Sequence, residues 1–158
     1  KSGKEQSVDV KDKRLARIVQ RSKDVPGQEL FQYIDEDGGR HPISSTDVNA
    51  YLRDISGQDF TAKDFRTWNG TLLAILTLLE CEPYKTLKQA KQNVTETVKR
   101  VAEELGNTPA VCRKYYVHPV VLEAYQDGSL TEALENLRLP KKSNGLHPEE
   151  SLVIMLTL

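Results

Sequence analysis

The sequence predicts a mainly α-helical domain with a small β element near its N-terminal end. Apolar residues recur at three- and four-residue spacing over most of the chain, which is typical of amphipathic helices. Residues 72–79 are apolar almost all the way round a helix, as expected of a buried central helix. Strand-like patterns occur only among the first 34 residues. A chain of 158 residues is long enough for one domain with a core of its own.

Two short strands are predicted before residue 35. Residues 6–10 alternate apolar and polar side chains, and residues 30–34 read LFQYI. We expect residues 6–10 to pair either with residues 30–34 or with a segment upstream of the chain. The acidic and glycine-rich residues 35–39 predict a turn, and they lack the ligand alternation of a calcium-binding loop.

Residues 11–22 predict a surface helix with a strongly basic face. Leu15, Ile18 and Val19 give the helical spacing, and Val25-Pro26-Gly27 ends the segment. Its cations are Lys11, Lys13, Arg14, Arg17 and Arg21. This face is either simply solvated or contacts phosphate groups, and the pattern is compatible with both.

Clear start signals mark the next helices. Residues 44–47 (SSTD) predict a helix start, and the apolar stripe that follows ends at Gly57. This stripe consists of Val48, Tyr51, Leu52 and Ile55. Residues 61–64 (TAKD) begin the central helix, which ends before Pro83 and carries Lys63 and Arg66 near its start.

The second half of the chain predicts further helices. Residues 86–105 form a long amphipathic helix, and a short helix follows Gly106. Asn107 or Thr108 can cap this short helix, Pro109 suits its first turn, and Pro119 closes it. Shorter helices are predicted over residues 119–125 and 130–137, and a final helix begins near Pro148. The apolar positions of that final helix are Leu152, Val153, Met155 and Leu156.

Composition narrows the classes of function. The residues are 38% hydrophobic and 28% charged, as in ordinary soluble proteins, and no apolar run approaches the ~20 residues that cross a bilayer. The net charge of −1 argues mildly against nucleic-acid binding, although the early basic segment could form a local basic face. Cys81 and Cys112 lie 31 residues apart without a CxxC motif and are expected to be reduced thiols. The histidines show no metal-ligand spacing, so no metal site is predicted.

Tyr115 and Tyr116 follow two cations, Arg113 and Lys114, in the short bounded helix. A phenol, with an ordinary pKa of about 10, attacks phosphorus only when cations stabilise the charge that develops. Arg66 could supply a guanidinium fork and Asn107 a second hydrogen-bond donor. From these residues alone, packing of the tyrosines and a surface position for Arg66 are the simpler interpretations.

Two stretches resemble the motifs of type IB DNA topoisomerases. Residues 61–68 (TAKDFRTW) resemble the K-D-[LF]-R-T-[WY] box, and residues 106–109 (GNTP) followed by Tyr116 resemble the [HN]-T-P…Y segment. The overall similarity is to the catalytic domain of the small bacterial and poxvirus-type enzymes. Tyrosine recombinases share the fold, but their first box usually carries His where this sequence has Lys63. The topoisomerase branch is therefore favoured.

The resemblance implies roles for the matched residues. Tyr116, nine positions after Asn107, is selected over Tyr115 as the nucleophile that forms a 3′-phosphotyrosyl bond with DNA. Arg66 would hold a non-bridging phosphate oxygen, with Lys63 as an auxiliary cation. Asn107 stands where many relatives carry His, so the donor at this position is a neutral amide.

The family's general acid is a lysine on a β-hairpin upstream of the box. Lys1 and Lys4 lie 65 and 62 positions before Arg66, and the family spacing favours Lys1 over Lys4. The family's first catalytic arginine and its smaller N-terminal DNA-clamp domain are expected upstream of residue 1. Residues 1–158 are therefore predicted to be most of a catalytic domain, which acts as a monomer with its own N-terminal domain.

The implied function is relaxation of supercoiled double-stranded DNA by transient cleavage of one strand, strand rotation and religation. The resemblance implies that this reaction uses no metal, ATP or other cofactor and no membrane. The residues expected to contact the DNA backbone are Lys11, Lys13, Arg14, Arg17, Arg113 and Lys114. For a bacterial source, the protein would be cytoplasmic and nucleoid-associated. The alternatives are a tyrosine recombinase or integrase catalytic domain, and a non-enzymatic helical DNA-binding or interaction module.

Overall fold

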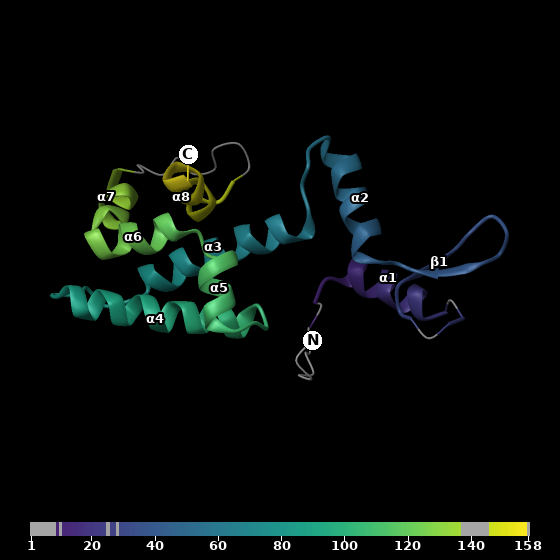
Figure 1. Ribbon diagram of the computed structural model, residues 1–158, viewed down its shortest axis with the longest axis horizontal. Coiled ribbons are helices and arrows are strands. Elements are labelled where there is room, and N and C mark those ends of the chain that lie inside the picture. The colour runs from purple at the N-terminus through teal and green to yellow at the C-terminus, as the bar shows by residue number, and fades with distance from the viewer. Residues whose placement is uncertain (1–8, 10, 25, 28, 137–145, 158) are drawn as a thin grey trace. The chain divides into compact units, whose positions relative to one another are not determined.

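The computed structural model describes residues 9, 11–24, 26–27, 29–136 and 146–157. These residues form eight helices and one two-stranded antiparallel sheet, which confirms the predicted fold class (Figure 1). The chain divides into two compact units, unit 1 at residues 1–62 and unit 2 at residues 63–158. Each unit is described by itself below.

Unit 1 begins with the basic helix α1 (Lys13–Asp24). The helix starts two residues later than the sequence predicts because the Asp12 carboxylate accepts the N–H groups of Arg14 and Leu15, at 2.7 and 2.9 Å. A side chain that accepts the first free N–H groups of a helix fixes where that helix begins. No residue of α1 is buried, so it is a surface helix as predicted.

A β-hairpin follows, formed by β1 (Gln32–Ile34) and β2 (Arg40–Pro42), with Tyr33 opposite His41. The sequence predicts β1 but not β2, because an Arg-His-Pro segment shows no apolar alternation. Residues 6–10, the other predicted strand, lie outside the described residues except for Asp9, which is not in a strand. Their pairing stays a prediction.

Asp35 holds the turn of this hairpin closed. Its carboxylate accepts the N–H of Gly39 at 2.6 Å and contacts Nε2 of His41 at 2.7 Å. The hydrogen bond from His41 and that from Gly39 keep the pKa of Asp35 below its ordinary value. The predicted turn at residues 35–39 is therefore confirmed as the link between the two strands.

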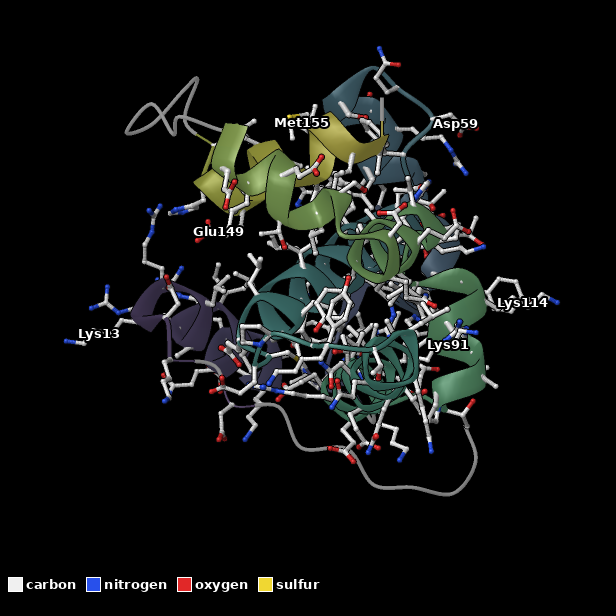
Figure 2. The ribbon with its side chains drawn as sticks, turned by 90° about the vertical axis from the view of Figure 1, so that its left-hand side faces the viewer. Lys13, Asp59, Lys91, Lys114, Glu149 and Met155 are labelled. Atoms are coloured by element: carbon white, nitrogen blue, oxygen red, sulfur yellow. The ribbon has the colours of Figure 1, made fainter. Side chains whose placement is uncertain are left out.

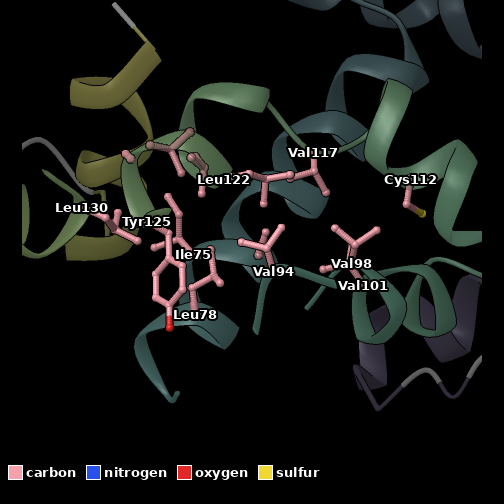
Figure 3. Packing of buried hydrophobic residues seen from close by; sticks show 14 of the residues in the cluster. Ile75, Leu78, Val94, Val98, Val101, Cys112, Val117, Leu122, Tyr125 and Leu130 are labelled. Atoms are coloured by element: carbon pink, nitrogen blue, oxygen red, sulfur yellow. The ribbon is translucent and has the colours of Figure 1, made fainter. Parts of the chain in front are cut away.

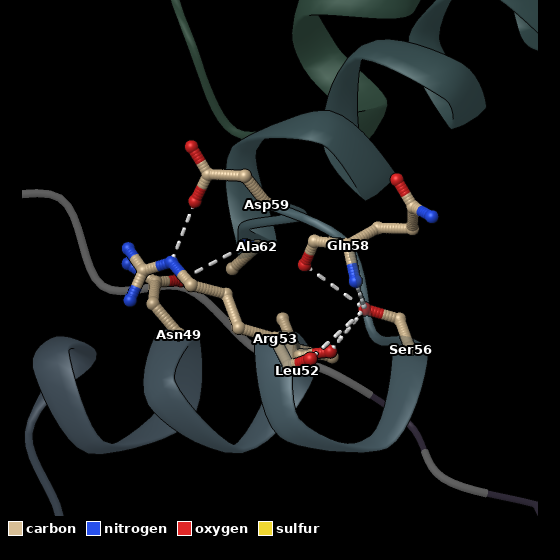
Figure 4. Close-up of polar contacts among 7 residues, drawn as sticks. All are labelled: Asn49, Leu52, Arg53, Ser56, Gln58, Asp59 and Ala62. Atoms are coloured by element: carbon tan, nitrogen blue, oxygen red, sulfur yellow. Dashed lines mark hydrogen bonds and ion pairs between the residues drawn. The ribbon is translucent and has the colours of Figure 1, made fainter.

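Helix α2 (Ser45–Ser56) starts at the predicted position, with Ser44 and Asp47 forming a capping box. It ends at Gly57, whose φ of 65° is a left-handed conformation that glycine adopts without strain. The connection to the next helix is held by polar contacts: Arg53 pairs with Asp59 at 2.7 Å, and Asn49 accepts the N–H of Ala62 at 3.0 Å (Figure 4).

The apolar stripe of α2 is largely exposed in the structure. Tyr51 is 63% exposed and Ile55 is 60% exposed. None of the described residues of unit 1 is buried. The predicted apolar stripe of α2 is therefore present, but it is not buried among the described residues.

Unit 2 contains the other six helices of the described chain. They are α3 (Ala62–Leu79), α4 (Leu87–Glu104), α5 (Pro109–Tyr115), α6 (Pro119–Asp127), α7 (Ser129–Asn136) and α8 (Pro148–Thr157). Their starts agree with the predicted starts to within one or two residues. Gly128, at a φ of 89°, separates α6 from α7, between the two predicted helices.

The hydrophobic core lies within unit 2. Ile75 and Leu78 of α3 pack in one cluster with Val94, Val98 and Val101 of α4, and α5 to α8 add further buried side chains (Figure 3). This confirms α3 as the buried central helix. Some apolar side chains of the predicted helices are exposed instead, among them Leu76 of α3 at 37%, Leu87 in the first turn of α4 at 56%, and Met155 in the last turn of α8 at 45%.

Both cysteines are free thiols, as predicted. Cys112 is buried in the core cluster and Cys81 is half-buried at the end of α3. Among the described residues, no helix combines the length and apolar character that spanning a membrane requires.

The core predicts different costs for two leucine truncations. Leu78 is 1% exposed, so Leu78→Ala should lower the free energy of unfolding by about 2–5 kcal/mol. Leu87 is 56% exposed, so Leu87→Ala should change it by about 0.5 kcal/mol or less. Urea unfolding followed by circular dichroism measures both values. Equal losses for the two variants would contradict this core.

Candidate active site

The matched residues of the candidate active site all lie in unit 2, around the start of α3. Lys63, Arg66 and Thr67 lie three and four positions apart there, so they share one face of the helix. Arg66 and Thr67 are half-buried, whereas Lys63 is exposed. This face meets the α4–α5 connection and the C-terminal end of α5.

The α4–α5 connection places Asn107. Gly106, at a φ of 62°, turns the chain at the end of α4, and the N–H of Asn107 bonds to the Ala102 carbonyl at 2.8 Å. Of the two candidate caps, Thr108 is the one that caps α5, by accepting the N–H of Val111 at 3.3 Å. The side chain of Asn107 is therefore not used as the cap.

Leu105, the residue that follows α4, joins the two predicted donor residues through its carbonyl oxygen. This oxygen accepts one hydrogen bond from Nη2 of Arg66 at 2.7 Å and another from Nδ2 of Asn107 at 3.0 Å. Carbonyls at a helix C-terminus lack intrahelical partners and carry partial negative charge, so they favour a cation. The end of α4 thus holds a guanidinium and an amide side by side.

Tyr116 caps the C-terminal end of α5 and is half-buried beside Arg66. The guanidinium carbon of Arg66 lies 5.0 Å from the centre of the Tyr116 ring, within the range of a cation–π contact. The structure therefore brings three of the predicted residues together: Arg66, Asn107 and Tyr116.

Tyr115 has a different environment, although it is the adjacent residue. It is 46% exposed, and its ring lies 5.3 Å from Nζ of Lys63 and 5.0 Å from Nζ of Lys114. The predicted auxiliary cation, Lys63, is therefore placed against Tyr115. Arg66 therefore contacts Tyr116, whereas Lys63 and Lys114 contact Tyr115.

The other predicted residues lie outside the described part of the chain, in unit 1, or on the exposed surface of α5. Lys1 and Lys4, the candidates for the general acid, lie outside the described residues. The proposed DNA-contacting residues of α1 and the segment before it, Lys11, Lys13, Arg14 and Arg17, are exposed within unit 1. Arg113 and Lys114 are exposed on α5, and the labelled side chains of Lys13 and Lys114 extend away from their helices (Figure 2).

Three residues of α3 that the sequence analysis did not single out contact the backbone around Tyr116. Thr67 Oγ1 lies 3.1 Å from the Tyr115 carbonyl and 3.0 Å from the Lys63 carbonyl, so its single O–H is shared between these two acceptors. Thr71 Oγ1 accepts the N–H of His118 at 3.0 Å. Gly70 lies so close to the Tyr116 carbonyl that a side chain at that position would collide with it. The sequence signal for these residues is two threonines and a glycine within one turn of α3, just before its apolar second half.

Comparison with known proteins identifies the family. The sequence model of the family described as "Eukaryotic DNA topoisomerase I, catalytic core" matches residues 2–142. The chain belongs to the type IB DNA topoisomerase family. The match covers both sequence boxes and the whole cluster around Leu105, and it confirms the resemblance seen in the sequence.

A curated relative agrees with this assignment. The chain is 39% identical over 108 residues to a protein named DNA topoisomerase 1B from Acanthamoeba polyphaga mimivirus. The aligned region covers 64% of the chain and 32% of that relative. The chain therefore spans about a third of the length of the topoisomerase it matches.

The packing of α5 predicts unequal reactivity for the two thiols. Burial raises the pKa of the Cys112 thiol, and the nearby charge of Arg66 only partly opposes this effect. Because the thiolate is the reactive form, Cys112 should be alkylated by iodoacetamide much more slowly than the half-buried Cys81. Peptide mass spectrometry over a time course measures both rates, with the urea-unfolded chain as the control. Equal rates in the folded chain would contradict the burial of Cys112.

Proposed function

We propose that this chain carries the strand-cleaving centre of a DNA topoisomerase that relaxes supercoiled double-stranded DNA. The observation that carries the proposal is the cluster of Arg66, Asn107 and Tyr116 around the Leu105 carbonyl. A phenol, a guanidinium and an amide donor are the groups that attack of tyrosine on a phosphodiester requires. Membership of the topoisomerase family supports the same proposal.

In the proposed cleavage step, the phenolic oxygen of Tyr116 attacks the phosphorus of one DNA strand. The phenol gives up its proton to solvent water as a bond forms between this oxygen and phosphorus. The bond from phosphorus to the 5′ oxygen breaks, which leaves a 3′-phosphotyrosyl ester and a 5′ hydroxyl. The leaving oxygen takes a proton from a general acid, for which Lys1 is the first candidate and Lys4 the second. The reverse reaction reseals the strand.

Arg66 supplies the main positive charge for this step. A guanidinium has five N–H donors, and the bond to Leu105 occupies one of them. The other donors could hold the non-bridging oxygens, whose negative charge grows as the phenol attacks. The ester keeps the energy of the broken phosphodiester bond, so the proposed cycle needs neither ATP nor a metal ion.

The proposed DNA partner is held by phosphate contacts rather than by base readout. Lys63, Arg113 and Lys114 place positive charge around the tyrosine pair, and the exposed basic residues of α1 offer further contacts. We propose that the enzyme is a monomer whose DNA clamp is completed by a separate N-terminal domain.

Replacement of each tyrosine tests the nucleophile. The intact protein that carries this chain is incubated with a nicked duplex in which the fragment downstream of the cleaved bond is short. This fragment carries the new 5′ hydroxyl and dissociates after cleavage, so that the covalent adduct accumulates. Tyr116→Phe should abolish the adduct, whereas Tyr115→Phe should retain it, and mass spectrometry of the adducted peptide should locate the DNA on Tyr116. An adduct that persists in Tyr116→Phe would exclude the proposed nucleophile.

Replacement of Arg66 tests the proposed charge stabilisation. Arg66→Ala should slow single-turnover cleavage on the order of 10²–10³-fold, the usual loss when one donor to a developing charge is removed. Arg100→Ala is the matched control, because Arg100 pairs with Glu80 on the surface of unit 2 and should leave cleavage unchanged. Similar rates for the two variants would refute the role of Arg66.

Relaxation of a plasmid separates the topoisomerase from the recombinase alternative. A topoisomerase should relax supercoiled plasmids of unrelated sequence without exchanging strands, and the products can be followed on agarose gels. Strand exchange confined to plasmids with a specific site would favour a recombinase instead.

A further inference from the structure

We propose that Thr67, Gly70 and Thr71 are positioning residues that hold the backbone of residues 115–118, so that Tyr116 faces Arg66. This inference rests on the proposed function, because it gives these residues a role in strand cleavage by Tyr116. It gives α3 a second role in the site: the helix carries the Arg66 guanidinium and also contacts the segment that contains Tyr116.

The three residues form one continuous contact face. Gly70 and Thr71 lie three and four positions after Thr67, so each is its neighbour on the surface of α3. The shared O–H of Thr67 donates to the Tyr115 carbonyl at 3.1 Å. Gly70 lies against the Tyr116 carbonyl. Thr71 accepts the N–H of His118 at 3.0 Å. The contacts therefore run along the segment from Tyr115 to His118 within about one turn of α3.

Residues 116–118 lie between α5 and α6, so α3 can supply contacts that hold their backbone in place. Tyr116 follows the last residue of α5 with φ −124° and ψ −10°, outside the helical range. Its N–H and that of Val117 both bond to the Cys112 carbonyl, but α5 has only seven residues, and isolated helices of that length are not stable. Thr71, which is 2% exposed, satisfies the next N–H, that of His118.

Gly70 sets how closely α3 approaches this segment. A methyl group at this position would overlap the Tyr116 carbonyl oxygen, which belongs to a backbone that cannot rotate away. Any larger residue must therefore push Tyr116 away from α3 and from Arg66. Because in-line attack tolerates little displacement, a shift of about 1 Å could cost on the order of 10²-fold in rate.

Thr77 provides a matched control for Thr71. Both are threonines of α3 with buried side chains, 8% and 2% exposed. The hydroxyl of Thr77 has no hydrogen-bond partner among the described residues, whereas that of Thr71 accepts the His118 N–H. Replacement by valine keeps the shape of either side chain and removes its hydroxyl. A difference between the two variants therefore reports the contact with the segment.

The test compares Thr71→Val, Thr71→Ser, Gly70→Ala and Thr77→Val in the intact protein. Thr71→Val and Gly70→Ala should slow single-turnover cleavage on the order of 10²-fold, with the Kd for a duplex DNA unchanged. Thr71→Ser keeps the acceptor oxygen and should recover most of the rate, and Thr77→Val should cleave like the parent. A merely structural role would lower Tm but leave the cleavage rate of the folded protein intact.

A second readout does not depend on activity. Hydrogen exchange of the His118 amide should be faster in Thr71→Val than in the parent and Thr77→Val, because only the first loses the acceptor. If Thr71→Val cleaves at the parent rate, or if its His118 amide exchanges at the parent rate, the positioning role is excluded. If the parent itself forms no adduct, the proposed function fails, and the exchange data still show whether Thr71 holds the segment.

Discussion

The carbonyl oxygen of Leu105 is the point on which the candidate site depends. It accepts hydrogen bonds from Arg66 and Asn107, two side chains that lie 41 positions apart in the sequence. A helix C-terminus attracts cations, but a surface cation there is usually free to move. Here the hydrogen bond from Arg66 to the Leu105 carbonyl is part-buried, and the Arg66 guanidinium also makes a cation–π contact with Tyr116. One backbone atom therefore fixes the direction of both donors with respect to the tyrosine.

Helix α3 connects this site to the stability of unit 2. Its second half is buried in the core through Ile75 and Leu78, so the whole helix is held in place by packing. Its first half carries Arg66 and contacts the segment around Tyr116. Because protein cores are close-packed and resist compression, burial of the second half of α3 limits how far the helix can move. The core thereby supports the geometry of a site that itself buries few apolar side chains.

The helices and both motifs could be predicted from the sequence because each depends on local pattern. Apolar periodicity located α3 and α4, and capping residues located the start of α2. The strand β2 could not be predicted, since its pairing depends on the partner strand rather than on its own residues. The hydrogen bonds to the Leu105 carbonyl and the hydrogen bond from the His118 N–H to Thr71 could not be predicted either. Every residue has a backbone carbonyl, so the sequence does not indicate which one accepts a hydrogen bond from a side chain. The Thr71–His118 contact joins positions 47 residues apart, which local patterns do not reveal.

The structure also clarifies what an asparagine can contribute at position 107. Carbonyl oxygens only accept hydrogen bonds, so the amide of Asn107 must turn its nitrogen toward Leu105. That nitrogen has two N–H groups, and the bond to Leu105 uses one. The second can be donated to a phosphate oxygen, without the charge that a protonated histidine would bring. In the proposed reaction the positive charge at the phosphate must then come from Arg66 and the lysines, and Asn107 contributes direction rather than charge.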